Sequence, residues 1–266
     1  MYDFAYHRPQ SLSEASRLLE ANADSQLLAG GMTLLPTLKQ RLARPSSLID
    51  LGAVPDLAGI AVTGDGLTIG AMTSHAHVAK SADVKKMIPA LAQLAGGIGD
   101  PHVRHRGTIG GSIANNDPAA DYPAALLGLG ATVRTTERTI AADDFFTGMF
   151  TTALEAGEIV TSICFPIPKY AAYIKFRNPA SRYALVGVFV ASTPSGVRVA
   201  VTGAAPCVFR QAEMERALAA SWTPQAVRAV KQTVDGLMSD IHGTAEYRAH
   251  LVGVLSRRAL ESMSDR

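Results

Sequence analysis

The sequence predicts an α+β fold that is divided into two or three lobes. Three observations support this fold class. Strand-like and helix-like runs alternate up to about residue 52, short strand-like runs dominate to about residue 202, and helical periodicity takes over from residue 210. The chain has 266 residues, of which 47% are hydrophobic and 18% charged, so it can bury a substantial core in one large domain or two modest ones.

The first 52 residues predict a lobe in which strands and helices alternate. The sequence Ser11-Leu-Ser-Glu14 is a capping box, which predicts that a short helix begins beside it. A short buried strand at residues 26–29 is followed by a second helix, which Thr33 can cap. Residues 47–51 predict a returning strand, so the lobe has a β-α-β rhythm.

Residues 53–165 predict shorter elements around one unusual segment. That segment, residues 96–121, is rich in Gly, Asn, Asp and Pro. The helix expected before it contains Pro89, which predicts a kink. The expected elements are a hairpin of strands 60–63 and 67–70 turning at residues 64–66, a helix at 83–94, a short helix at 124–129, a hairpin at 132–140 and a strand at 159–165.

Pro166 and Pro168 mark a candidate domain boundary, because they end the strand before them. Beyond them the pattern first predicts an antiparallel meander and then helices. The strands are expected at residues 173–176, 183–191 and 197–202, and the helices at 210–220, 224–238 and 245–263.

Composition excludes several classes of function. The 25 basic and 23 acidic side chains are nearly balanced and form no basic stripe, so a nucleic-acid partner is not expected. The polar start of the chain predicts no signal peptide, and the apolar runs are too short to span a membrane. The two cysteines, Cys164 and Cys207, have no C-x-x-C spacing and are expected to be small core residues in a reducing compartment.

Two glycine-rich loops carry the strongest chemical signal. The first, residues 29–33, stands between an expected strand and a helix start, where a helix offers unpaired N–H groups to an anion. The second, residues 107–112, has small residues, main-chain donors and two hydroxyls. Neither loop is a P-loop or a Rossmann fingerprint, and each alone is compatible with a plain tight turn. Together they are suited to a ligand with two linked phosphates.

Two aspartates follow the second loop. Asp117 and Asp121 can cap a turn or the next helix, or they can accept hydrogen bonds from ribose hydroxyls beside a bound nucleotide. The residues themselves leave both alternatives open.

Taken together, these features resemble the FAD-binding medium subunit of the carbon-monoxide dehydrogenase and xanthine dehydrogenase family, the molybdenum hydroxylases. The resemblance extends over nearly the whole chain and looks closest to the carbon-monoxide-dehydrogenase-like branch. The matching segments are AGGMTLLPTLKQRLARPSSLIDL (29–51), IGAMTSHAHV (69–78), IGDPHVRHRGTIGGSIANNDPAADYPAALL (98–127) and YIKFRNPASRYALVGV (173–188).

The resemblance implies a vanillyl-alcohol-oxidase (PCMH)-type FAD-binding domain at residues 1–168, with lobes at about 1–52 and 53–168. It also implies a C-terminal domain at residues 169–266, like that of carbon-monoxide dehydrogenase flavoproteins, in which a three-stranded antiparallel sheet is followed by helices. This order agrees with the strands and helices expected from the pattern alone.

The resemblance also assigns cofactor-binding positions. Residues 29–33 wrap the FAD pyrophosphate, residues 108–112 form a second wall, Asp121 contacts the nucleotide and Asp117 is a second candidate. A lysine near the isoalloxazine favours the anionic reduced flavin. The implied FAD-binding residues are Leu28, Ala29, Gly30, Gly31, Met32, Thr33, Leu34, Ile98, Thr108, Ile109, Gly110, Gly111, Ser112, Asp117, Asp121, Val160 and Lys175.

The function that the resemblance implies is electron transfer. The chain passes electrons from the [2Fe-2S] clusters of a small partner subunit through FAD to an external acceptor, and a large partner subunit holds the molybdenum cofactor. A cytoplasmic dimer of heterotrimers, a heterohexamer, is expected. The chain contains no cysteine-rich insertion for a further cluster, and no NAD motif is legible. The substrate and the acceptor cannot be inferred from this subunit.

Other functions were weighed. His75 and His77 would share one face of a strand and His102 and His105 form another pair, but no further ligand completes a metal site for either. Whether these histidines or Tyr183 touch the flavin is left open. The remaining alternatives are a free-standing FAD-dependent oxidase, which predicts turnover by the isolated chain, and a non-redox nucleotide-binding module, which predicts a colourless protein.

Overall fold

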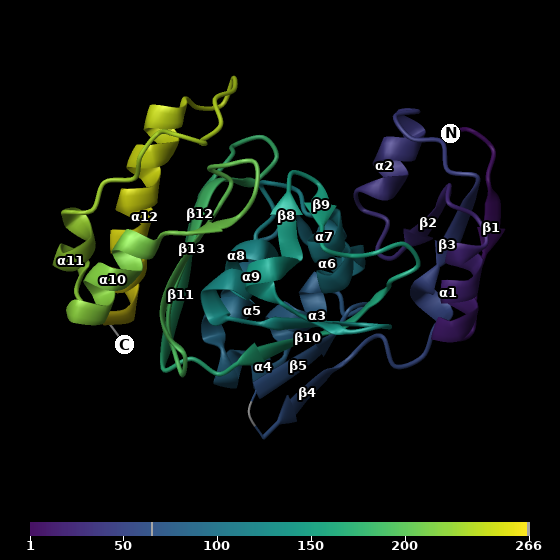
Figure 1. Ribbon diagram of the computed structural model, residues 1–266, viewed down its shortest axis with the longest axis horizontal. Coiled ribbons are helices and arrows are strands. Elements are labelled where there is room, and N and C mark those ends of the chain that lie inside the picture. Colours follow the sequence, from purple (N-terminus) through teal and green to yellow (C-terminus); the bar gives the residue numbers. More distant parts are fainter. Residues whose placement is uncertain (65, 265–266) are drawn as a thin grey trace.

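The computed structural model describes residues 1–64 and 66–264, and it divides into three lobes in chain order (Figure 1). The N-terminal lobe and the C-terminal helices lie at opposite ends, with the second lobe between them. This arrangement confirms the α+β class and the order of lobes predicted from the sequence. The turn expected at residues 64–66 includes residue 65, which lies outside the described residues.

The first lobe is a small parallel sheet with two helices. Its elements are β1 (Ala5–His7), α1 (Leu12–Glu20), β2 (Ser25–Leu28), α2 (Leu34–Lys39), β3 (Ser47–Asp50) and the 3₁₀ helix η1 (Leu51–Ala53). The strand order is β1-β3-β2. The Ser11 hydroxyl caps α1 by accepting from the N–H of Glu14, as the capping box predicts. Sequence reasoning missed β1, because its three residues are mostly exposed and carry no apolar alternation.

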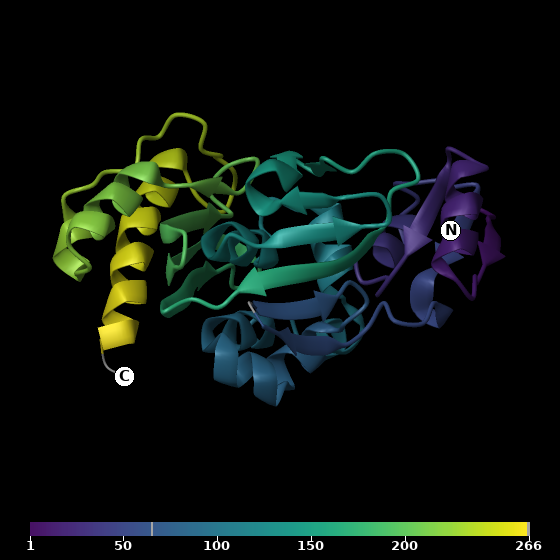
Figure 2. The same cartoon turned by 60° about the horizontal axis from the view of Figure 1, so that its bottom comes forward.

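The second lobe is built on a five-stranded antiparallel sheet, visible in the centre of Figure 2. The strands, in sheet order, are β4 (Ile60–Thr63), β5 (Gly66–Gly70), β10 (Val160–Pro166), β6 (Thr132–Thr135) and β7 (Thr139–Ala141). The other elements are α3 (His75–Lys80), α4 (Ala82–Met87), α5 (Pro89–Gly96), α6 (Pro101–Arg106), α7 (Ile109–Asn115), α8 (Tyr122–Leu129), α9 (Ala142–Phe145) and the hairpin β8 (Phe146–Gly148) and β9 (Thr151–Thr152).

Two expectations for this lobe were wrong, and two of its helices were not predicted. His75 and His77 lie on helix α3 and not on a strand. The helix expected at residues 83–94 is two helices, because Pro89 has no N–H to continue α4 and instead occupies the first turn of α5. The unusual segment 96–121 contains α6 and α7, which are too short and too glycine-rich or polar to show helical periodicity.

The C-terminal lobe is an antiparallel sheet covered by helices. Its elements are β11 (Tyr170–Arg177), β12 (Ala184–Thr193), β13 (Gly196–Thr202), β14 (Phe209–Arg210), α10 (Ala212–Ala220), α11 (Pro224–Arg228) and α12 (Ala245–Ser264). The predicted three-stranded meander is present, and the two-residue strand β14 extends it. The helix expected to reach residue 238 ends at Arg228. Beyond it Gly236 adopts a left-handed conformation (φ +76°), which a helix does not accommodate.

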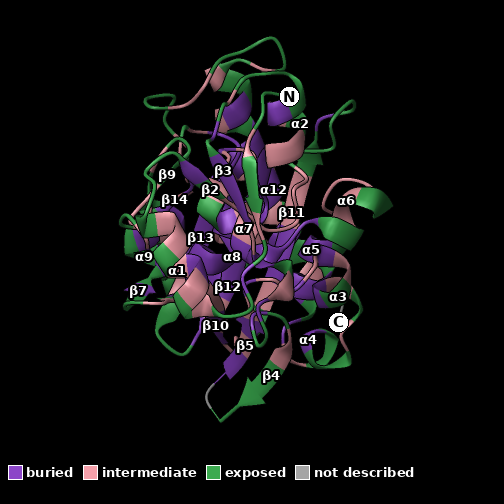
Figure 3. Cartoon of the chain, turned by 90° about the vertical axis from the view of Figure 1, so that its right-hand side faces the viewer, coloured by how far each residue is buried: buried purple, intermediate pink, exposed green. Residues whose placement is uncertain are grey.

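The core explains why the second and third lobes stay together. The C-terminal sheet buries one face, including Phe189 and Ala191, against the second lobe and the other face, including Val188 and Val190, against α10–α12. Helix α8 is buried along its whole length beneath this sheet. The first lobe packs on a smaller cluster that contains Ala15, Ile49 and, from the second lobe, Ile159. Figure 3, seen along the long axis, shows buried residues in the interior and exposed ones on the outer loops. The second lobe and one face of the C-terminal sheet thus share one buried cluster, whereas α10–α12 and the first lobe each pack on another cluster.

In the part of the chain that the structure describes, no helix has the length and apolarity needed to cross a membrane. Cys164 and Cys207 form no disulfide, as their spacing suggests, and both are only partly buried, although Cys207 packs against the central core as expected.

Candidate functional site

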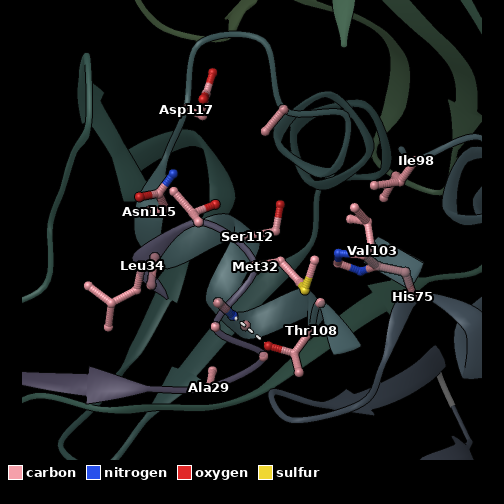
Figure 4. Close-up of a pocket in the computed structure, with 18 of the residues that line it drawn as sticks. Ala29, Met32, Leu34, His75, Ile98, Val103, Thr108, Ser112, Asn115 and Asp117 are labelled. Carbon is pink, nitrogen blue, oxygen red and sulfur yellow. Dashed lines mark hydrogen bonds between the residues drawn. The ribbon is translucent and has the colours of Figure 1, made fainter. Parts of the chain in front are cut away.

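A cleft of about 770 Å³ lies where the first lobe faces the second. Such a volume is in the upper part of the range for small-molecule sites. Its walls are formed by the loop between β2 and α2, the start of α7, the turn before α6, the beginning of β10 and the loop between β11 and β12. Figure 4 shows the two glycine loops facing this space from below and His75, Val103 and Ile98 from one side.

The first glycine loop, residues 29–33, presents main-chain donors that have no partner. The N–H groups of residues 30–33 make no hydrogen bond to any other described residue. Gly31 adopts φ +72°, which turns the chain between β2 and α2. Thr33 occupies the N-cap position as predicted, but its hydroxyl makes no capping hydrogen bond. The loop therefore combines a free hydroxyl with several free N–H groups, an arrangement that binds anions.

The second glycine loop, residues 107–112, uses its main-chain donors within the protein. The Thr108 hydroxyl caps α7 by accepting from the N–H of Gly111 at 3.1 Å. The N–H groups of residues 107, 109, 110 and 112 donate to the carbonyls of Val103, Thr73, Ala71 and Thr108. The expectation that this loop offers main-chain donors to a ligand is therefore wrong for these residues. The Ser112 hydroxyl, which lines the cleft, remains available.

The glycines also fit the two loops against their neighbours. A Cβ at Gly30 would lie 2.1 Å from the carbonyl oxygen of Arg106, and a Cβ at Gly110 would lie 2.5 Å from Cβ of Ala71. Both distances are too short for any side chain. These two glycines are required because segments of the same chain pack closely against them, whether or not a ligand approaches.

Asp121 is held by the C-terminal sheet. Its carboxylate is buried, accepts from the Tyr173 hydroxyl at 2.5 Å and lies 2.9 Å from Nζ of Lys175. Burial raises the pKa of Asp121, and the hydrogen bonds from Lys175 and Tyr173 oppose that rise. Asp121 lines the cleft, whereas Lys175 does not. The geometry thus gives Lys175 the role of neutralising Asp121, and a direct contact of Lys175 with a flavin stays a prediction.

Asp117 is engaged more loosely. One of its oxygens accepts from the N–H of Ala119 at 2.8 Å, which is the turn-capping alternative considered from the sequence. The side chain also lines the cleft, and burial raises its pKa. The second oxygen has no partner among the described residues. Asp117 therefore has more accepting capacity for a ligand than Asp121.

Most of the sequence-predicted site residues come together in the cleft. Those that line it are Ala29, Gly30, Gly31, Met32, Thr33, Leu34, Ile98, Thr108, Gly110, Gly111, Ser112, Asp117, Asp121 and Val160. Leu28, Ile109 and Lys175 do not line it, and Ile109 is instead a fully buried core residue. Tyr183, whose position was left open, lines the cleft together with its neighbour Arg182.

Sequence reasoning missed several lining residues. His75 was weighed as a metal ligand and its contact with the flavin was left open, although it lies in the segment IGAMTSHAHV that carries the family resemblance. Asp100 is the N-cap of helix α6, and Val103 lies in the first turn of that helix. Both were missed because the helix itself was not predicted. Within residues 1–64 and 66–264, no group of three His, Cys, Asp or Glu side chains is arranged to hold a metal ion.

Comparisons with known proteins agree over the full chain. Residues 2–168 match the family described as "FAD binding domain in molybdopterin dehydrogenase", and residues 171–263 match "CO dehydrogenase flavoprotein C-terminal domain". The chain is 39% identical to the nicotine 6-hydroxylase medium subunit of Paenarthrobacter nicotinovorans, over 96% of this chain and 95% of the relative. It is 36% identical to the carbon monoxide dehydrogenase medium chain of Hydrogenophaga pseudoflava, over 97% and 96%.

A solved structure of a related enzyme contains a chain with the same fold. The reconstituted CO dehydrogenase from Oligotropha carboxidovorans contains a chain with a TM-score of 0.94 to this one at 35% identity, and the match covers 100% of this chain and 99% of the other.

Proposed function

The chain belongs to the family of FAD-binding medium subunits of molybdenum hydroxylases, and we propose that it holds FAD in the cleft between its first two lobes. It is an oxidoreductase subunit that passes electrons from the [2Fe-2S] clusters of a partner subunit to an external acceptor. FAD supplies this chemistry when bound, because a flavin can accept electrons singly and release them as a pair.

The observation that carries the proposal is the set of free main-chain donors in the first loop. The N–H groups of residues 30–33 have no partner among the described residues and belong to residues that line the cleft. A diphosphate satisfies such donors without needing a basic side chain. Ser112 faces the same space from α7 and adds a hydroxyl donor. The cleft volume of about 770 Å³ also suits a ligand larger than a mononucleotide.

The remaining residues shape the site. Ile98, Val160 and Met32 supply apolar surface, and Asp117 supplies an acceptor for sugar hydroxyls. The carboxylate of Asp121, bound to Tyr173 and Lys175, ties the back of the cleft to the C-terminal sheet. The chain's task is to bind and orient the cofactor and to exclude water from it. No side chain of this subunit needs to act as an acid or base.

The wider assembly is proposed from the relatives, which are medium chains or subunits of multi-subunit enzymes. The molybdenum cofactor belongs to a large partner subunit and the [2Fe-2S] clusters to a small one. The expected assembly is a cytoplasmic dimer of heterotrimers. Within this chain, residues 1–168 form the FAD-binding domain and residues 169–266 the C-terminal domain, although the second lobe and the C-terminal sheet share one core.

The first test is an absorption spectrum with cofactor extraction. The purified protein is expected to be yellow and to release FAD, and the complex in which it is purified is expected to contain iron and molybdenum. A colourless protein would instead favour a non-redox nucleotide-binding module. Turnover of an organic substrate by the isolated chain would favour a free-standing oxidase.

A charge placed in the cleft tests the location. Ala114 is an exposed residue of α7 that lines the cleft, so its substitution leaves the core intact. Ala114→Glu is expected to weaken FAD binding roughly tenfold through repulsion of the diphosphate, whereas Ala114→Gln and Ala114→Lys are expected to stay within about threefold of the original protein. Equal affinities for the Glu and Lys variants, measured by fluorescence titration of flavin-free protein, would place the diphosphate elsewhere.

A further inference from the structure

His75 is held firmly against the second glycine loop. It is the first residue of α3, and its main-chain N–H donates to the carbonyl oxygen of Gly107 at 2.9 Å. The Ser74 hydroxyl caps the helix by accepting from the N–H of His77. The main chain at His75 is therefore fixed to the loop that forms one wall of the cleft.

The imidazole is buried and confined on two sides. Only 5% of the residue is exposed, yet it lines the cleft. On one side a Cβ at Gly107 would lie 2.6 Å from Nε2, so the ring packs closely on that glycine. On another side the ring of Tyr122 lies 5.3 Å away between centroids. Neighbouring side chains thus leave the ring little room to turn away from the cleft.

Among the described residues, the imidazole finds no hydrogen-bond partner. Its Nδ1 is buried and makes no hydrogen bond to any residue in the described part of the chain, and the same is true of the Tyr122 hydroxyl. Buried polar groups in folded proteins are nearly always paired, and an unpaired one is a sign of a missing ligand or water. An isolated core histidine would gain stability from a hydrogen bond to a carbonyl or carboxylate, and no described residue forms one with Nδ1.

The ring is neutral at physiological pH. Burial, and secondarily the positive charge of Arg104, lowers the pKa of His75 to about 4. The Arg104 guanidinium itself donates to the carbonyls of Ile98 and Gly99. A neutral imidazole has one N–H and one lone pair. Because an enclosed N–H without an acceptor is rarer than an enclosed lone pair, the proton belongs on Nε2, the outer nitrogen of the ring.

The outer edge of the ring points into the cleft. Figure 4 shows the imidazole of His75 directed toward Met32 and the space between the two glycine loops, beneath Val103 and Ile98. We propose that His75 contacts bound FAD, with Nε2–H donating a hydrogen bond to an uncharged acceptor at the flavin end of the cofactor. A neutral donor suits a ring carbonyl, a ring nitrogen or a ribityl hydroxyl, whereas the diphosphate is served by the free N–H groups of residues 30–33.

This inference rests on the proposed function, and the experiment separates the two. The full-length chain, purified with any subunits that accompany it, is stripped of flavin and titrated with FAD and, separately, with ADP. His75→Leu is expected to weaken FAD binding roughly tenfold while ADP binding changes less than about twofold, because ADP has no flavin end. The melting temperature of the flavin-free variant is expected to equal or exceed that of the original protein, since an unpaired buried polar group has been removed.

Two further variants serve as matched controls. His75→Gln places an amide near the position of Nε2, and His75→Asn places one near Nδ1. The Gln variant is expected to bind FAD within about threefold of the original protein, and the Asn variant to bind it as weakly as the Leu variant. Equal FAD affinities for the Gln and Asn variants would overturn the inference even if the Leu variant does not fold.

Other outcomes are equally decisive. FAD binding by the Leu variant at the original affinity, or a parallel loss of FAD and ADP binding, would also overturn the inference, while FAD uptake by the original protein would leave the proposed function standing. An original protein that takes up no FAD would overturn the proposed function itself.

Discussion

The two glycine loops of the cleft have similar composition and opposite hydrogen bonding. In the first loop the N–H groups of residues 30–33 have no partner among the described residues, and the Thr33 hydroxyl caps nothing. In the second loop the N–H groups of residues 109–112 all donate within the protein, and the Thr108 hydroxyl caps α7. The first loop is thus built to receive hydrogen-bond acceptors from a ligand, and the second is built to hold the wall in place.

This difference shows what a glycine-rich sequence leaves unspecified. Small residues permit close approach of the main chain, but they do not say what approaches. At Gly110 the neighbour is Ala71 of the same lobe, and at Gly30 it is the main chain at Arg106. The two glycines bring protein segments together, and only around them does the first loop keep free donors for a cofactor.

The largest expected effect comes from substituting these glycines. Gly110→Ala and Gly30→Ala are each expected to lower the free energy of unfolding by about 3 kcal/mol, because the new Cβ would overlap atoms of the adjacent segment of the same chain. Thermal or denaturant unfolding of the flavin-free protein measures this loss. Loss of flavin from such a variant would therefore report damage to the fold and not the loss of a ligand contact.

A matched control lies in helix α12. A Cβ at Gly253 would meet no atom within 4 Å, so Gly253→Ala is expected to stabilise the protein by about 0.5–1 kcal/mol through helix propensity. If Gly110→Ala and Gly253→Ala had the same effect on stability, the packing role assigned to Gly110 would be wrong.

The two threonines give a smaller and sharper comparison. Thr108→Ala is expected to lower the free energy of unfolding by about 1 kcal/mol, because α7 loses its cap, and Thr108→Ser is expected to restore most of it. Thr33→Ala is expected to change stability by less than about 0.5 kcal/mol, because its hydroxyl makes no capping bond. Urea unfolding of the three variants decides the matter, and a Thr33→Ala loss as large as that of Thr108→Ala would contradict the distinction.

Much of this fold could be predicted from the sequence. The capping box at Ser11, the strand and the helix on either side of Gly30 and the antiparallel strands after Pro168 each have a local signal that matches the observed element. Helices α6 and α7 were missed although each begins at a local cap, from Asp100 and Thr108. They are too short for a periodic pattern: α6 carries one aliphatic residue, Val103, and α7 carries the single pair Ile109 and Ile113.

The cleft, too, was predicted only in part. The motif resemblance brought most of the lining residues together, but it could not reveal that both neighbours of Asp121 come from the C-terminal sheet. Nor could it show that His75 belongs to a helix end beside the second loop. These facts depend on the packing of segments that are far apart in the chain, and no local pattern records them.

Hydrogen exchange of the main-chain amides, measured with and without FAD, tests the central claim most directly. Unpaired amides exchange fast and hydrogen-bonded ones slowly. We expect residues 30–33 to exchange rapidly in the flavin-free protein and to become strongly protected by FAD, while residues 109–112 are already protected and change little. Protection by FAD that appears at residues 109–112 and leaves residues 30–33 unchanged would contradict the account.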